Sequence, residues 1–419
     1  MYDTNFENQV PDGAKPVIQV LYATVSSADR SSHRWQSGIP MQDFNRRTAL
    51  ISAAVTLGGL ALAGRAATAG QAAKTSSLFD ASKNPNPERI APYKPRFGRS
   101  KPLVAIVGLN EGTIISDFCI PFGVMARSGV ADVVSVSVTP GPVKMQPLTF
   151  QLQTTVDEFD KSHPEGADYI FVPAVENDSD AGLLRWIKAQ AGKGCTVISI
   201  CYGAMAVANT GLFDGHRATS HYSNEEMRVR RFPNVNWQKN IRYVADGKVV
   251  SSAGVSASMP TSIALVEAIA GPAKAAQVAR DVGIDGWSSK HDSDAFQSDP
   301  GNADMPARDA KPDVKLGIPV KTGDDEIALA LTAESYSRTG NTMAYAVAAS
   351  GAPMRLAHGL VLLPDLVAGG PTKVDRTLAP LEAHEATRAL DIALADITKT
   401  YGPKAARHVA LFMEYPGPK

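Results

Sequence analysis

Between residues 101 and 285, short apolar runs alternate with segments of helical spacing, and this alternation limits the fold more than any other feature. Strands are predicted at 103–108, 133–138, 169–173, 196–200 and 249–254, and helices at 117–128, 181–191, 203–209 and 262–270. Uninterrupted apolar runs are typical of strands that are buried on both faces. The alternation therefore predicts an α/β fold with a mostly parallel sheet between two helix layers. In such sheets chemistry gathers at the carboxyl ends of the strands.

The last third of the chain is predicted to be a smaller α/β part. Residues 286–323 are polar and rich in Pro and Gly, which predicts a linker, and an apolar run begins at Glu326. The nonapeptide that starts at Gly402 shares five of nine residues with the one that starts at Gly271. We interpret 324–419 as a repeat of 101–285 whose middle is missing, with coincidence between two Ala-rich helix ends as the alternative. Deletion of 324–419 should then expose apolar surface and cause aggregation or dimerisation.

The first hundred residues are interpreted as targeting and linker segments rather than as part of a folded domain. Residues 1–40 are polar and are predicted to be a disordered extension, and Met41 is an alternative start. Residues 41–69 combine Arg46-Arg47, a weakly apolar run and a small-residue cleavage pattern at Ala67-Thr-Ala, typical of a twin-arginine signal peptide. A membrane anchor is the weaker alternative, because the run is short and rich in Gly. A periplasmic or secreted protein is predicted, or a cytoplasmic one if the signal is not used; 70–100 is predicted to be a linker.

Composition excludes several classes of function. The 419 residues include 42 Lys and Arg and 42 Asp and Glu, so no net charge draws the chain to nucleic acid or to an anionic membrane. No phosphate-binding loop, metal-ligand spacing or helix-turn-helix pattern occurs, so we expect no cofactor, no metal, no nucleic acid and no stable membrane insertion after signal removal. Three cysteines cannot all pair, so at least one thiol stays free or pairs between chains.

The turn at Cys201 is the most informative stretch. A predicted strand ends at Ile200, Cys201 follows at once, and a helix of small residues begins at Gly203. This is the layout of a nucleophile elbow. The helix N-terminus and nearby N–H groups favour a thiolate there, and the Tyr202 N–H is a candidate oxyanion donor. The alternative is a small core cysteine, which is the interpretation that suits Cys119 and Cys195.

Four segments carry a family likeness: 116–124, 169–173, 200–222 and 252–259. The third is long and specific, running from Ile-Cys-Tyr-Gly-Ala to Gly-Leu-Phe-Asp-Gly-His-Arg-Ala-Thr-Ser-His-Tyr. Together they resemble the ThiJ/PfpI superfamily within the class I glutamine amidotransferase-like fold, most closely its isocyanide-hydratase-like members and the sensor domains of AraC-type regulators. The resemblance covers about 101–285 and implies a flavodoxin-like three-layer sandwich.

The resemblance also implies roles for individual residues. Cys201 is the candidate nucleophile, Asp117 the acid that hydrogen-bonds its sulfur, and His221 a residue near it. Glu111, in the first strand-to-helix loop, is a second candidate acid. A helix N-cap is the alternative for Asp117, and a buried structural histidine is the alternative for His221.

The chain departs from the family pattern in the predicted oxyanion loop, where Ala174 and Val175 stand in place of the usual glycines. Tyr202 stands where hydratase-like members carry Thr, so a different substrate choice is expected. Two classes of function follow. The first is a cysteine-dependent hydrolase or hydro-lyase acting on a small electrophile, as a hydratase, amidase or glyoxalase-like enzyme. The second is a redox or ligand sensor without a DNA-binding domain. The expected partners are a small molecule and either a second copy of the chain or, intramolecularly, the C-terminal part.

Overall fold

The computed structural model describes residues 88–296, 313–382 and 386–416. The chain divides into two units, 1–70 and 71–419, and every described residue belongs to the second unit. The predicted extension 1–40 and signal peptide 41–69 lie outside the described residues, as do most of the linker 70–100 and residues 297–312 of the linker 286–323.

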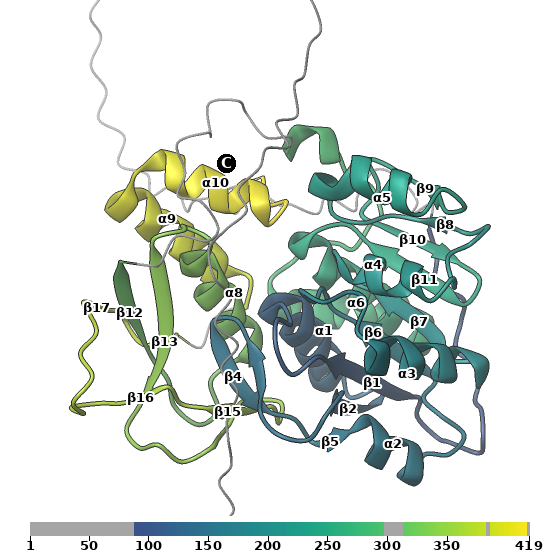
Figure 1. Cartoon of the computed structure of the whole chain (residues 1–419), viewed down its shortest axis with the longest axis horizontal. Helices are drawn as coiled ribbons and strands as arrows, with labels where there is room; N and C mark the ends of the chain where they lie inside the picture. Colours follow the sequence, from purple (N-terminus) through teal and green to yellow (C-terminus); the bar gives the residue numbers. More distant parts are fainter. Residues whose placement is uncertain (1–87, 297–312, 383–385, 417–419) are drawn as a thin grey trace, which may run out of the picture. The chain divides into compact units, whose positions relative to one another are not determined.

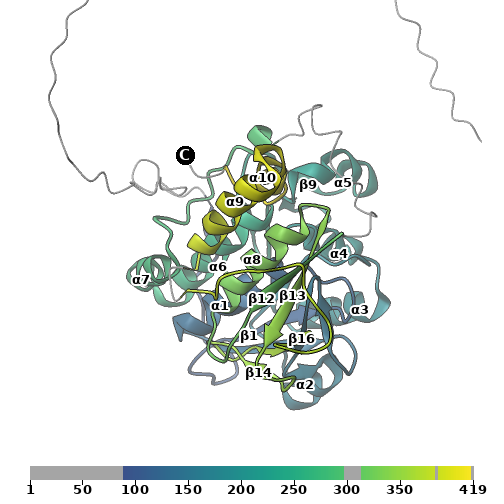
Figure 2. The same cartoon turned by 90° about the vertical axis from the view of Figure 1, so that its left-hand side faces the viewer.

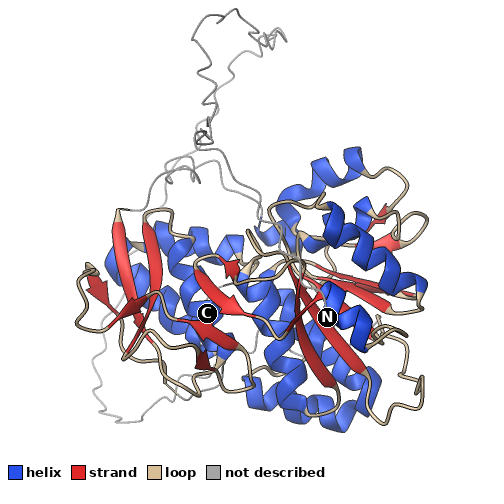
Figure 3. Ribbon diagram, turned by 60° about the horizontal axis from the view of Figure 1, so that its bottom comes forward, coloured by secondary structure: helices blue, strands red, loops and turns tan. Residues whose placement is uncertain are grey.

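A seven-stranded sheet in the order β10-β11-β7-β6-β1-β2-β5 organises the first part of the structure (Figure 3). Its strands are β1 (Leu103–Gly108), β2 (Asp132–Ser137), β5 (Thr154–Thr155), β6 (Tyr169–Val172), β7 (Thr196–Ser199), β10 (Tyr243–Asp246) and β11 (Val249–Ser252). All neighbours are parallel except β10 and β11, which form an antiparallel pair. The mostly parallel sheet confirms the fold class predicted from the sequence.

Helices cover both faces of this sheet. The covering helices are α1 (Ile115–Ser128), α2 (Val156–Ser162), α3 (Ala181–Gly192), α4 (Gly203–Asn209), α6 (Val255–Ala270) and α7 (Pro272–Val282). Side chains of β1 alternate between two cores: Val104 and Ile106 pack with α1, α6 and α7, whereas Ala105 and Val107 pack with α2, α3 and α4. A strand buried on both faces needs this period-two alternation of apolar residues.

A segment that lies outside the main sheet, here called the excursion, connects α4 to β10. It contains β8 (Arg217–Ala218), the 3-10 helix η1 (Tyr222–Asn224), α5 (Glu225–Arg231) and β9 (Asn236–Trp237). A second 3-10 helix, η2 (Ser293–Phe296), follows α7. The excursion matters for the site because it carries residues 220–223 past the carboxyl end of β7, where the Ser220 hydroxyl donates to the Cys201 carbonyl over 2.9 Å.

The C-terminal part is a smaller α/β layer, as predicted (Figure 1). Its parallel sheet has the order β16-β13-β12-β17. Its elements are β12 (Val314–Pro319), α8 (Glu326–Ser337), β13 (Thr342–Ala348), β16 (Leu366–Val367), β17 (Arg376–Thr377), α9 (Arg388–Tyr401) and α10 (Pro403–Phe412). Strand β12 lies within the stretch 286–323 that is predicted to be a linker. The sequence pattern does not indicate this strand because Lys315 and Gly317 interrupt its apolar run.

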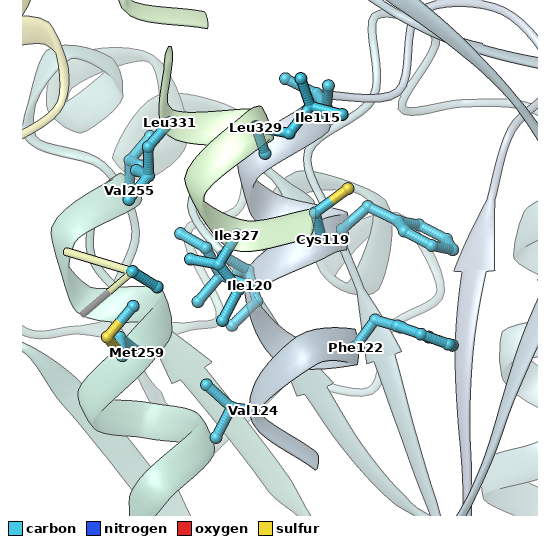
Figure 4. Close-up of a cluster of buried hydrophobic side chains, with 14 of the residues drawn as sticks. Ile115, Cys119, Ile120, Phe122, Val124, Val255, Met259, Ile327, Leu329 and Leu331 are labelled. Atoms are coloured by element: carbon cyan, nitrogen blue, oxygen red, sulfur yellow. The ribbon is translucent and has the colours of Figure 1, made fainter. Parts of the chain in front are cut away.

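Two contacts join the C-terminal part to the first. The hairpins β3–β4 (Val143–Met145, Leu148–Gln151) and β14–β15 (Met354–Arg355, Val361–Leu363) combine into one sheet through the antiparallel pair β4–β15. Helix α8 packs on α1 and α6 with a shared apolar cluster (Figure 4), in which Ile327 lies against Ile120 and Leu331 against Val255. Figure 2 shows α8 and α9 in front of α1 and α6.

None of the helices in the described ranges has the length and apolar character needed to cross a membrane.

Candidate active site around Cys201

Cys201 lies in a sharp turn at the carboxyl end of β7. Its backbone has φ 55°, in the left-handed region that side chains other than glycine seldom adopt. Gly203 makes the turn possible, because a Cβ at this position would lie 2.1 Å from the carbonyl oxygen of Val172 at the end of β6. The strand, the left-handed residue and the following helix α4 together have the geometry of the predicted nucleophile elbow.

Asp117 reaches the same point from the first turn of α1 and is fully buried. Its Oδ2 accepts a hydrogen bond from the Ala174 N–H over 3.2 Å, and the Cys201 thiol is a further hydrogen-bond partner of the carboxyl group. Oδ1 receives no hydrogen bond from oxygen or nitrogen donors among the described residues. The N-cap of α1 is Ile114, so Asp117 does not cap this helix.

Burial raises the pKa of Asp117 to about 8, and the negative charge of Glu334 adds to the effect. The Ala174 N–H, Arg338 and the Cys201 thiol act in the opposite direction but are weaker. The carboxyl group is therefore mainly protonated at neutral pH and can donate a proton. This is the protonation state that a general acid beside a sulfur nucleophile requires.

The resting state of Cys201 differs from the prediction. Its side chain is only 4% exposed, and burial raises the pKa of the thiol well above its usual value, reinforced by Asp117, Glu414 and Glu334. The Tyr202 N–H acts on the sulfur in the opposite direction, as expected of an elbow, but it is outweighed. The expectation of a thiolate at rest is therefore wrong, because burial and the charges of three carboxyl groups outweigh the N–H groups at the start of α4, a helix of only seven residues.

Two of the three predicted oxyanion donors, Ala174 and Tyr202, are engaged in the described structure. The Ala174 N–H donates to Asp117, whereas the hydrogen bonds of the bridge between Thr113 and Val175 are made by the Ala174 carbonyl and the Glu176 N–H. The Tyr202 N–H interacts with the Cys201 sulfur, while the Tyr202 hydroxyl lies 2.7 Å from Ser223 Oγ. The two N–H groups thus flank the thiol and the acid. A substrate oxygen would have to compete with Asp117 for the Ala174 N–H.

His221 is buried near the elbow, but its ring nitrogens face elsewhere. Nε2 lies 2.8 Å from the carbonyl oxygen of Phe412, which can only accept, so Nε2 carries the hydrogen. Nδ1 then accepts from the Ser223 N–H over 3.2 Å. Burial lowers the pKa of His221, so the ring is neutral. In this arrangement His221 links the elbow to the C-terminal segment, and no hydrogen bond joins it to Cys201 among the described residues.

Glu111 lies in the loop between β1 and α1, as predicted, but it is exposed. It forms an isolated parallel bridge with Lys144 of β3. Among the residues that the structure describes, it makes no side-chain hydrogen bond to Cys201 or Asp117. The two acids proposed from the sequence are thus separated, and only Asp117 contacts the thiol.

Two carboxyl groups that sequence reasoning did not find come from the C-terminal part. Glu334 of α8 is buried, and it accepts from the Ser116 N–H over 3.2 Å and from Arg338 Nη2 over 2.8 Å. Glu414, just after α10, is fully buried in a left-handed conformation with φ 50°. They lie 133 and 213 residues after Cys201 in the chain, and no local motif marks them.

Glu414 is held by three groups. Its Oε1 accepts from the Tyr222 N–H over 2.9 Å, its Oε2 lies 2.7 Å from His291 Nε2, and its carbonyl oxygen accepts from the Ser256 hydroxyl over 2.6 Å. Burial alone would raise the pKa of Glu414, but the hydrogen bond from His291, the nearby His221 ring and the hydrogen bond from the Tyr222 N–H hold it below its usual value. The carboxylate is therefore ionised at neutral pH, in contrast to Asp117.

A cavity of about 490 Å³ opens on the far side of Glu414. Its wall includes Arg242, Ser256, Lys290, His291 and Phe296. Glu414 thus belongs both to this wall and to the charged surroundings of Cys201. No group of three or more potential metal ligands occurs within the described ranges.

The raised pKa of Asp117 predicts that the folded protein loses stability as the pH rises from about 4 to 8. In this window the unfolded chain has released the Asp117 proton while the folded protein keeps it, so each pH unit favours unfolding. One such group contributes a slope of at most about 1.4 kcal/mol per pH unit. Asp117→Asn should remove this contribution in urea unfolding between pH 4 and 9, whereas the exposed Asp132→Asn should retain it. Equal slopes in the wild type and Asp117→Asn would contradict the assignment.

Part of the chain is similar to known proteins. Residues 104–268 match the model of the DJ-1/PfpI family. The HTH-type transcriptional regulator CdhR of Pseudomonas aeruginosa is 30% identical over 96 residues, which are 23% of this chain and 28% of the regulator. The Parkinson disease protein 7 homolog of Danio rerio is 26% identical over 192 residues, 42% of this chain and 93% of that protein. The chain thus spans little more than a quarter of the regulator.

Solved structures align with a similar share of the chain. Oxidised DJ-1 of Toxoplasma gondii aligns with a TM-score of 0.39 at 19% identity, over 44% of this chain and 99% of its own. DJ-1beta of Drosophila melanogaster aligns with a TM-score of 0.40 at 19% identity, over 44% and 98%. An AraC family transcriptional regulator of Pseudomonas putida aligns with a TM-score of 0.38 at 17% identity, over 42% and 97%.

Proposed function

We propose that this protein, whose residues 104–268 match the model of the DJ-1/PfpI family, is a cysteine-dependent enzyme that acts on a small electrophilic substrate. Cys201 is the proposed nucleophile and Asp117 the proposed acid. The substrate classes that suit them are α-oxoaldehydes, isocyanides, nitriles and amides, in which a carbon bound to oxygen or nitrogen accepts the sulfur. The reaction is then a hydration or a hydrolysis.

One observation carries the proposal, namely the pairing of a left-handed Cys201 with a protonated Asp117 at its sulfur. The left-handed conformation costs about 1–3 kcal/mol of folding free energy. A cysteine with only a structural role would not require this strained conformation. A fully buried carboxyl group is also costly, and here it contacts the thiol. Strain and a perturbed acid at one point are typical of functional sites.

The two groups together can add a thiol across a polar double bond. The sulfur forms a bond to the electrophilic carbon, and the π electron pair moves to the oxygen or nitrogen. That atom takes the proton of the Asp117 carboxyl group (in an isocyanide the attacked carbon itself takes it), and the carboxylate takes the proton of the thiol, so atoms and charge balance. Water then releases the product and restores the thiol. Because both groups start protonated, this route needs no thiolate at rest.

Turnover measurements test this proposal. A panel of methylglyoxal, small isocyanides, nitriles and amides is offered to the wild type, to Cys201→Ala and to Cys195→Ala, which removes a buried thiol elsewhere in the sheet. We expect Cys201→Ala to reduce kcat/KM by about a thousandfold or more, while Cys195→Ala stays close to the wild type. Turnover that survives Cys201→Ala would disprove the nucleophile.

The burial of Cys201 supports a second candidate, a non-catalytic sensor that holds a ligand or records oxidation. A thiol that is 4% exposed and mainly protonated reacts slowly with bulky reagents. The likeness of 96 residues to a transcriptional regulator suits this alternative. Saturable binding of a panel compound without turnover, or reversible oxidation of Cys201 by hydrogen peroxide without turnover, would favour the sensor over the enzyme.

A further inference from the structure

The C-terminal part repeats the strand order of the first part. The sequence of elements β1-α1-β2, hairpin β3–β4, β5 and β6 gives a sheet order β5-β2-β1-β6. The sequence β12-α8-β13, hairpin β14–β15, β16 and β17 gives the order β16-β13-β12-β17. All strand pairs in both runs are parallel. Four strands, one crossover helix and one hairpin therefore occur twice in the same arrangement.

The closing helices also repeat. Helix α6 ends at Gly271 and α7 begins with Pro272, while α9 ends at Gly402 and α10 begins with Pro403. The backbone angles of the two glycines agree, with φ 83° and ψ 171° at Gly271 and φ 90° and ψ 165° at Gly402. Glycine is nearly the only residue that adopts this conformation. The shared nonapeptides thus form the same helix–helix corner in both parts.

The contact between the two parts is symmetric in these repeats. On α1, Ser116 contacts Glu334 of α8, and Gly123 lies so close to Ile327 that a Cβ would be 2.7 Å from its Cγ1. Ser116 and Gly123 are seven residues apart on α1, and Ile327 and Glu334 are seven residues apart on α8. If Ser116 corresponds to Ile327 and Gly123 to Glu334, the contact between Ser116 and Glu334 becomes the contact between Ile327 and Gly123 when the two helices are exchanged. The β4–β15 pairing is likewise centred on Phe150 and Leu362. Self-complementary contacts of this kind are typical of a twofold dimer interface.

The second copy lacks the elements that carry the nucleophile. Nothing in the described ranges corresponds to β7, α4 or β11 beside β17, and no cysteine follows Cys201 in the chain. Its last residues instead join the site of the first copy. The Phe412 and Met413 carbonyls accept from His221 and from the Ser256 N–H, and Glu414 binds the Tyr222 N–H.

We propose that the C-terminal part is a degenerate second copy fused as a permanent partner, and that its Glu414 is a positioning residue which holds the 220–223 loop and a carboxylate beside the Cys201 elbow. The inference rests on the proposed role of Cys201 and adds a residue to that site. Glu414 fixes the 220–223 loop through Tyr222 and places a negative charge near the sulfur.

Several other groups act on this arrangement. Charged or titratable groups that face Cys201 or Glu414 are Asp117 of α1, Glu334 and Arg338 of α8, His221 before η1, Arg228 of α5, Arg242 before β10 and His291 before η2. Glu334 is paired with Arg338, whereas imidazoles and the Tyr222 N–H hold Glu414. Removing the Glu414 charge should therefore change the ionisation of the thiol more than removing that of Glu334.

The test measures alkylation of Cys201 by iodoacetamide from pH 6 to 11, mapped by peptide mass spectrometry, in the full chain. We expect Glu414→Gln to lower the midpoint of the pH–rate profile by about one unit, roughly a tenfold faster reaction at pH 8. Glu414→Asp, which keeps the charge, should restore the wild-type midpoint. Asp292→Asn serves as the control, since it removes an exposed acid on the wall of the same cavity.

Four outcomes are distinguishable. A lower midpoint in Glu414→Gln, with a smaller shift in Glu334→Gln, supports the inference. If the alkylation rate of Glu414→Gln rises by the same factor at every pH, the substitution has only made Cys201 more accessible. This result overturns the proposed role of the Glu414 charge. An unchanged profile in Glu414→Gln, with normal alkylation of the wild type, overturns the inference but leaves the proposed function intact. A Cys201 that stays inert in every variant up to pH 11 also overturns the inference, whereas the proposed function is contradicted only by turnover that survives Cys201→Ala.

Discussion

A chain that ends at residue 312 is expected to aggregate or to dimerise instead of remaining a folded monomer. The deletion uncovers the faces of α1 and α6 on which α8 packs, including buried Ile115, Ile120, Val255 and Met259 (Figure 4). Burial of one such side chain is worth about 1.5–3 kcal/mol, so this group alone amounts to about 10 kcal/mol. That is comparable to the whole stability of a typical domain.

Size-exclusion chromatography with light scattering and thermal unfolding measure this effect. A chain without residues 1–70, which form a separate unit, is the matched control and should keep the wild-type melting temperature. If the two parts are repeats, two truncated chains can cover each other's exposed faces and form a dimer. A truncated chain that is monomeric and melts like the wild type would disprove the role of the C-terminal part as a partner.

Gly203→Ala is expected to destabilise the protein by about 3 kcal/mol or more and to disrupt the elbow. The new Cβ would lie 2.1 Å from the Val172 carbonyl oxygen and 2.8 Å from the Pro173 carbonyl group. These are backbone atoms of the neighbouring strand end, so they cannot rotate away as a flexible side chain would. Relief requires that α4 move away from β6, which takes Cys201 away from Asp117.

Urea unfolding of Gly203→Ala, compared with Gly192→Ala, measures the loss. Gly192 ends α3 and has open space where a Cβ would be, so alanine there should be neutral or stabilising by up to about 1 kcal/mol. The Cys201 alkylation profile of Gly203→Ala should also change, because the thiol loses its acid partner. Equal stability of Gly203→Ala and the wild type would show that the turn is not as tight as described.

Local patterns in the sequence were sufficient for five strands of the sheet (β1, β2, β6, β7 and β11) and for the elbow, but not for the edge strands β5 and β10. The apolar runs at 103–108 and 196–200 predict strands because both faces of each strand are buried, and the abrupt change at Cys201 predicts a strand-to-helix turn. Asp117 followed from its place in a family motif, and α1 does bring it to the sulfur. These features depend on neighbours along the chain or on one parallel-sheet rule, so sequence reasoning reaches them.

The protonation state of the site could not be predicted in the same way. The helix N-terminus and the Tyr202 N–H both favour a thiolate, and both can be recognised from residues next to Cys201 in the chain. The prediction of a thiolate at rest depends mainly on these two features. Burial and the charges of Glu334 and Glu414 act against the thiolate by raising the pKa of the thiol. The two charges reach the site only because the C-terminal part packs on the first part. His221 illustrates the same limit, since its Nε2 partner is the carbonyl of Phe412, 191 residues away.

The central claim is that the sulfur of Cys201 forms a covalent bond to the substrate with Asp117 as the proton donor. Its most direct test is to quench a reaction with a turned-over panel compound and to map adducts by mass spectrometry. We predict a transient adduct on the Cys201 peptide, absent in Cys201→Ala and accumulating more slowly in Asp117→Asn. Sustained turnover with no adduct at Cys201, and with unchanged rate in Cys201→Ala, would contradict the claim.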